Sequence, residues 1–76
     1  MKNNKVQLFG RVLLTENIGE FENGDVGVVV EIYGDDEGYE VEMLNANSET
    51  LDIITVLARQ VRSVEATDVL HVRQRA

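Results

Sequence analysis

Short apolar runs alternate along the chain with clusters of glycine, asparagine and aspartate, a spacing typical of β-strands joined by turns. Inside several runs, apolar and polar residues alternate, as they do when one face of a strand is buried and the other meets water. The segment 58–60, just before the last run, suits a single helical turn. We therefore expect an all-β protein with strands at about residues 5–15, 26–33, 39–44, 50–57 and 61–64.

The clearest turn signal is Gly24-Asp25-Val26-Gly27, which opens the second strand. Asn23 and Gly24 tolerate a positive φ, and the Asp25 carboxylate can accept a hydrogen bond that caps the turn. Gly27 has no side chain, which allows a crossing strand to pack closely against it. We expect this segment to act as a geometric hinge between the first loop and the second strand.

Side-chain alternation also separates a buried face of each strand from an exposed one. The strand at 50–57 is apolar on both faces near Ile53 and Ile54, which predicts a central or doubly covered strand. In the strand at 39–44, the glutamates fall on the outer face, and the inner face holds Tyr39, Val41 and Met43. In the strand at 26–33, the residues expected to face the core are Val26, Val28, Val30 and Ile32.

Pairing of the strands at 26–33 and 39–44 has a consequence for charge. Core-facing residues must lie opposite core-facing residues, so Ile32 should lie opposite Tyr39 or Val41. Glu31 would then lie opposite Glu40 in the first register and opposite Glu42 in the second. Either register places two carboxylates side by side, which destabilises a sheet by roughly 0.2–1 kcal/mol.

The charge of the chain is concentrated in its middle. The net charge is −7, and residues 16–52 carry twelve acidic residues and no lysine or arginine. Phosphate backbones bind through clustered basic residues, so this distribution argues against a nucleic-acid ligand. The same field attracts a basic protein surface, although acidity alone also keeps a small domain soluble.

Candidate chemistry is sparse. There is no cysteine, and His71 is the only histidine, so a catalytic triad is not expected. The cluster Asp35-Asp36-Glu37 lacks the alternating ligand spacing of a calcium loop. No apolar run approaches the roughly 18 residues of a membrane-spanning helix. We expect a non-enzymatic, cytoplasmic protein with no cofactor, metal ion or catalytic residue.

Short strands, a long first loop and a helical turn before the last core strand describe a five- to six-stranded SH3-like barrel. We expect a single domain over residues 1–76, with a core at about 5–64 and a C-terminal extension at 65–76. The residues that follow the turn strengthen this interpretation. The chain resembles the small bacterial family called domain of unknown function 4926 in the segments 12–16, 24–33, 39–43 and 49–50.

The family resemblance implies a small bacterial protein with an SH3-like barrel, and it does not point to any particular activity. Met43 departs from the family pattern, in which an aromatic residue is expected at that position. Similar small proteins sit beside toxin-like genes, and the resemblance therefore implies that this chain acts as the immunity or antitoxin partner of a toxin. The resemblance covers about residues 5–64 and leaves the C-terminal extension outside it.

Two functions follow as hypotheses. The first is a protein-binding module whose acidic surface docks a basic partner protein, such as a toxin. Its contact residues would be Glu31, Tyr33, Asp35, Asp36, Glu40 and Glu42. The alternative is an assembly module that forms a homo-oligomer through unblocked strand edges and the apolar residues of the tail, which are Val69, Leu70 and Val72.

Overall fold

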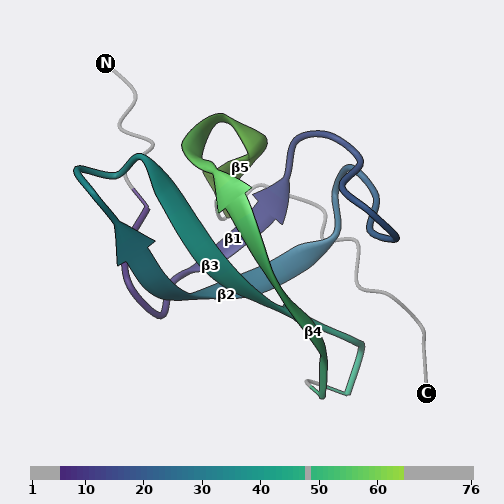
Figure 1. The fold of residues 1–76 in the computed structure, drawn as a ribbon. Helices are drawn as coiled ribbons and strands as arrows, with labels where there is room; N and C mark the ends of the chain where they lie inside the picture. The colour runs from purple at the N-terminus through teal and green to yellow at the C-terminus, as the bar shows by residue number, and fades with distance from the viewer. Residues whose placement is uncertain (1–5, 48, 65–76) are drawn as a thin grey trace.

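The computed structural model describes residues 6–47 and 49–64, and these residues form an antiparallel sheet (Figure 1). The strand order is β4-β3-β2-β1-β5, and one 3-10 turn, η1 (Ala58–Gln60), joins β4 to β5. The strands are β1 (Arg11–Leu14), β2 (Val26–Tyr33), β3 (Gly38–Leu44), β4 (Thr50–Leu57) and β5 (Val61–Ser63).

The predicted all-β class, the five strands and the helical turn before the last strand are confirmed. The sheet is not closed into a barrel, because β4 and β5 stand at its two ends in the described part of the chain. The predicted extension at 65–76, with Val69, Leu70 and Val72, lies outside the described residues.

The first strand is shorter than predicted, because a turn occupies residues 7–10. The Gly10 N–H donates to the Gln7 carbonyl at 2.9 Å, and Phe9 has a φ of 65°. The Phe9 N–H donates to the Val29 carbonyl at 2.6 Å, and the Val29 N–H donates to the Gly10 carbonyl at 3.0 Å. The turn is thus fixed to β2, and the prediction of a strand was wrong for residues 6–10.

The core lies on one face of the sheet, where strands from both halves of the chain contribute fully buried side chains. The predicted inner face of β3 is confirmed, since Tyr39, Val41 and Met43 are all buried. Phe21 reaches the core from the loop before β2, and Ile18 packs against it. The remaining buried members of the cluster are Val6, Val12, Leu14, Val29, Val56 and Val61.

The predicted core face of β2 was wrong in its centre. Val29 is completely buried, whereas Val28 and Val30 are only half-buried. The pairing of β2 with β3 shifts register between Val29 and Glu31, so Val30 is the extra residue of a β-bulge. A bulge changes which side chains share a face. The core side therefore runs through Gly27 and Val29 before the bulge and Ile32 after it.

The prediction for the fourth strand was also wrong. β4 is an edge strand that pairs only with β3 among the described residues. Ile53 is 51% exposed, while its neighbour Ile54 is half-buried and packs against the core. The apolar residues on the outer side of β4 are therefore surface residues, although their composition suggested burial.

The turn before β2 matches its prediction in geometry. The Glu22 N–H donates to the Asp25 Oδ2 atom at 2.9 Å, and Gly24 has a φ of 98°. A Cβ atom at Gly27 would lie 2.5 Å from the Val41 side chain and 2.9 Å from the Glu42 carbonyl oxygen. Only glycine allows β3 to approach β2 this closely.

Candidate protein-binding face

The outer face of β2, β3 and β4 carries most of the predicted contact residues, and we call it the acidic face. Its side chains stand in rows across the three strands, because residues paired in register project to the same side of a sheet. In chain order β2, β3, β4, the rows are Tyr33–Gly38–Leu57, Glu31–Glu40–Thr55 and Val28–Glu42–Ile53.

The middle row places two carboxylates directly opposite each other. Ile32 pairs with Tyr39 and Glu31 pairs with Glu40, so the first of the two predicted registers is confirmed. Neither Glu31 nor Glu40 has a cationic partner among the described residues. Arg11 stands on the same side of the sheet, but it pairs with Val28 in the neighbouring row. No ion pair with a described residue offsets the repulsion within the middle row, and the side-chain contact of Glu40 is with the neutral phenol of Tyr33.

Glu42 lies in the next row and has a different environment. The Thr50 hydroxyl donates a short hydrogen bond to Glu42 Oε2, and the Glu42 side chain is half-buried. This hydrogen bond joins β3 to the start of β4. Glu42 therefore has a structural role in holding β4 against β3.

Tyr33 lies at the end of β2 beside the carboxylate pair. The residue is 44% exposed. Partial desolvation raises the pKa of the Tyr33 phenol, and the negative charges of Glu40 and then Glu31 raise it further. The phenol therefore keeps its proton at neutral pH and presents a neutral aromatic ring next to two carboxylates.

Asp35 and Asp36 were predicted to join this surface, but the structure places them in the turn between β2 and β3. Asp35 is exposed, and Asp36 has a φ of 62°. Burial raises the pKa of the Tyr39 phenol, and the charge of Asp36 raises it further, so Asp36 acts on a residue of the core and not on the outer rows. The turn thus extends the negative charge around the end of the hairpin without adding to the rows of the acidic face.

Sequence reasoning missed three β4 residues of this face, namely Ile53, Thr55 and Leu57, and it placed a fourth member, Val28 of β2, in the core. Ile53 and Leu57 are 51% and 50% exposed, and each pairs in register with a residue of the outer face of β3. Strict alternation counted from the buried Val56 would have placed Leu57, Thr55 and Ile53 on one side. Apolar composition on both sides concealed that signal.

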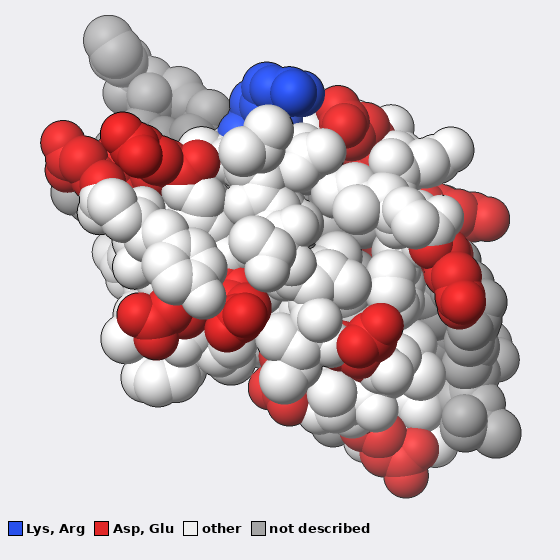
Figure 2. All heavy atoms as spheres, viewed as in Figure 1, with Lys and Arg blue, Asp and Glu red and all other residues white. Residues whose placement is uncertain are grey.

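Negative charge dominates the surface of the described residues, which carry twelve carboxylates and three arginines. In the view of Figure 2, red carboxylate atoms are spread over the molecule and a single blue cluster appears. The arginines are Arg11, Arg59 and Arg62.

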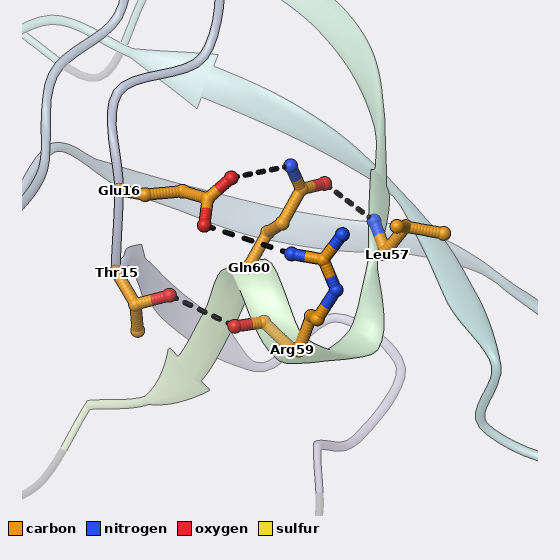
Figure 3. A network of polar contacts seen from close by, with 5 residues as sticks. All are labelled: Thr15, Glu16, Leu57, Arg59 and Gln60. Atoms are coloured by element: carbon orange, nitrogen blue, oxygen red, sulfur yellow. Dashed lines mark hydrogen bonds and ion pairs between the residues drawn. The ribbon is translucent and has the colours of Figure 1, made fainter.

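A second polar cluster joins η1 to the loop that follows β1 (Figure 3). The Thr15 hydroxyl donates to the Arg59 carbonyl at 2.9 Å, and Gln60 Nε2 donates to Glu16 Oε2 at 2.9 Å. Gln60 Oε1 accepts the Leu57 N–H at 2.8 Å. Arg59 Nη1 lies 3.7 Å from Glu16 Oε1. This η1 network fixes the end of β4, where the acidic face also ends.

Neither a metal centre nor a membrane span is indicated in the described part of the chain. Residues 6–47 and 49–64 contain no group of three histidine, cysteine or acidic side chains placed to hold a metal ion. Among the same residues, no helix is long and apolar enough to cross a membrane.

Comparison with known families gives one match. The family described as Domain of unknown function (DUF4926) matches residues 8–63, a range that includes all five strands. The chain therefore belongs to this family, as the sequence resemblance indicated. No curated protein and no solved structure is significantly similar to it.

Proposed function

We propose that the chain is a non-enzymatic protein-binding module whose acidic face docks a basic surface of a partner protein. The observation that carries this proposal is the pairing of Glu31 with Glu40 on an exposed part of the sheet. A small domain has little stability to spare, because it buries a limited fraction of its surface. A cationic partner would turn this repulsion within the sheet into attraction across an interface.

The proposed partner is a basic protein of the kind that an immunity or antitoxin protein neutralises, in the bacterial cytoplasm. Support comes from the charge distribution of the whole chain, whose net charge is −7. Steering by such a field speeds association with a basic partner and weakens as ionic strength rises.

A charge-reversal experiment tests this function. The tagged chain is used to capture proteins from a lysate of the source cell at low ionic strength, and captured proteins are identified by mass spectrometry. The variant Glu31→Lys/Glu40→Lys should lose a basic protein that the unchanged chain retains. The matched control is Glu20→Lys/Glu22→Lys, which makes the same change of net charge in the loop before β2 and should retain the partner. Equal capture by both folded variants would contradict the proposal.

The edge position of β4 favours the alternative, a homo-oligomer assembled through strand edges. Eight residues, Thr50–Leu57, form this edge, and they contain neither proline nor lysine, the residues that commonly block strand addition. This second function would use the unpaired side of β4 and leave the acidic face free.

A further inference from the structure

We propose that the Tyr33 end of the acidic face is a docking surface for an arginine side chain of the partner. This inference rests on the proposed function and narrows it to one kind of contact. The guanidinium group would stack on the exposed face of the Tyr33 ring and bind the carboxylates of Glu31 and Glu40. The aliphatic part of the arginine would lie on Leu57.

The first support is the combination of apolar and acidic groups on one side of the sheet. Five large hydrophobic residues are substantially exposed in the described part of the chain, and three of them belong to this face. Those three are Tyr33, Ile53 and Leu57. If the face served only to keep acidic molecules away, its carboxylates would be sufficient and the exposed apolar side chains would have no role. Apolar and acidic groups together fit a side chain with a long apolar stem and a cationic end.

The second support is the order of the rows. Gly38 stands between Tyr33 and Leu57 in register and contributes no side chain, so these two apolar groups face each other across β3. The carboxylate pair occupies the adjacent row, one step along the same strands. Adjacent strands are about 4.8 Å apart, so Tyr33 and Leu57 stand about 10 Å apart at the backbone. One extended side chain spans that separation.

The third support concerns the choice of cation. Tyr33 follows Glu31 by two residues on the same side of β2, and Glu40 lies directly opposite Glu31 on β3, so both carboxylates stand in the row beside the ring. A planar guanidinium can stack on an aromatic ring and donate several hydrogen bonds to carboxylates at the same time. A lysine ammonium is compact and strongly hydrated, and it gains less from such a site. The chemistry of the surface therefore favours arginine.

The test uses three capped synthetic peptides in which glycine alternates with arginine, lysine or uncharged citrulline. Each is titrated into the full isotope-labelled chain, and binding is followed by NMR chemical shifts. We expect the arginine peptide to bind about threefold more tightly than the lysine peptide, as stacking at an exposed ring predicts. The largest shifts should occur at Tyr33, Glu31, Glu40 and Leu57.

Three variants complete the test. Tyr33→Leu should remove the preference for arginine over lysine, while Tyr33→Phe, which keeps the ring, should retain it. Asp35→Asn is the matched control, because it removes one carboxylate in the turn and none on the face, and its preference should be unchanged. Tyr33 is 44% exposed, so both substitutions there should leave the fold intact, which the amide spectrum verifies directly.

The outcomes separate the two proposals. Equal binding of the arginine and lysine peptides, or a preference that survives Tyr33→Leu, would overturn the arginine surface and leave the basic-partner function standing. Equal binding of all three peptides, citrulline included, would show that the face does not recognise positive charge and would overturn both. Arginine-selective shifts that map elsewhere on the chain would likewise reject this location.

Discussion

Gly27 is the residue at which the packing of the sheet depends most directly on the absence of a side chain. In Gly27→Ala the new Cβ atom would lie 2.9 Å from the Glu42 carbonyl oxygen, and a backbone atom cannot move aside as a side-chain end can. We expect a loss of about 3 kcal/mol in the free energy of unfolding, near the upper end for overpacked cores. Urea denaturation followed by circular dichroism measures this loss.

Gly19→Ala serves as the control for Gly27. Gly19 has a φ of +58° and nothing within 4 Å of an added Cβ atom, so only backbone strain opposes the substitution. That strain costs about 1 kcal/mol. If the two alanine variants unfold at the same urea concentration, close packing at Gly27 is not the cause of its cost.

The raised pKa of the Tyr39 phenol predicts how the stability of the chain changes in alkaline solution. Burial raises the pKa of its phenol above the ordinary value of 10.0, and the charge of Asp36 adds to that effect. The folded chain therefore holds the phenolic proton more tightly than the unfolded chain does. The resulting stability is fully present below about pH 10 and is lost as the pH rises through the folded pKa.

The measurement is a series of urea unfolding curves from about pH 8 to about pH 11, a range that spans the ordinary tyrosine pKa. The free energy of unfolding should fall with rising pH in the unchanged chain and fall less steeply in Tyr39→Phe. Tyr33→Phe should reduce the slope as well, since the pKa of Tyr33 is also raised. Parallel slopes for all three proteins would refute the assignment.

At the scale of single residues, the sequence was sufficient to predict the positions of residues whose side-chain chemistry restricts where they can lie. Asp25 and Gly27 were predicted from what their side chains can and cannot do, and Tyr39 from alternation with the glutamates beside it. The burial of Val29 could not be predicted, because three consecutive valines at 28–30 give no contrast between the two faces. The bulge at Val30 determines which of these valines faces the core. The bulge arises from the pairing of β2 with β3, and the three valines alone do not reveal it.

At the scale of elements, the end of β4 depends on the η1 network. Gln60→Ala removes the acceptor of the Leu57 N–H and the donor to Glu16. Two exposed hydrogen bonds are lost, so we expect a decrease of about 1 kcal/mol in the free energy of unfolding. Faster amide hydrogen exchange at Leu57 would locate the effect.

Arg59→Ala is the matched comparison in the same turn. It removes only an ion pair in which the Arg59 side chain is 70% exposed and the Glu16 side chain 46% exposed. Such pairs contribute at most about 0.5 kcal/mol, and the backbone carbonyl that accepts the Thr15 hydroxyl remains. A larger loss in Arg59→Ala than in Gln60→Ala would show that charge, and not capping of the strand, holds the turn.

The pairing of β2 with β3 could be predicted because few registers bring buried residues opposite one another. The edge position of β4 could not be predicted, because its residues are apolar on both sides. Which strands lie next to β4 depends on the topology of the whole sheet and not on the sequence of β4 alone. Two consecutive isoleucines, at 53 and 54, look alike in the sequence and differ in exposure once β4 pairs with β3 alone. The acidic part of the candidate face was thus foreseen, and its apolar part was not.

For the whole molecule, the alternative function makes a distinct prediction. If β4 edges and the tail drive assembly, light scattering should show an oligomer for the full chain and a monomer for a chain ending at Glu65. A monomer in both cases would reject assembly through the tail. A reversal of charge at Glu31 and Glu40 should leave the mass unchanged, because these side chains project from the face of the sheet and not from its edge.

Overall charge gives the last prediction. The described residues carry twelve carboxylates and only three arginines, so the carboxylates repel one another overall and added salt should stabilise the chain. Glu31→Gln removes one member of the opposed pair, and we expect it to raise the free energy of unfolding by about 0.2–1 kcal/mol at low salt. Added salt should reduce this difference in the free energy of unfolding between the two proteins. The reason is screening, since the Debye length falls from about 30 Å at 0.01 M salt to about 3 Å at 1 M. Thermal melts of both proteins over this range measure it. An advantage that is absent at low salt would mean that Glu31 and Glu40 do not repel each other, and it would remove the observation on which the binding proposal depends.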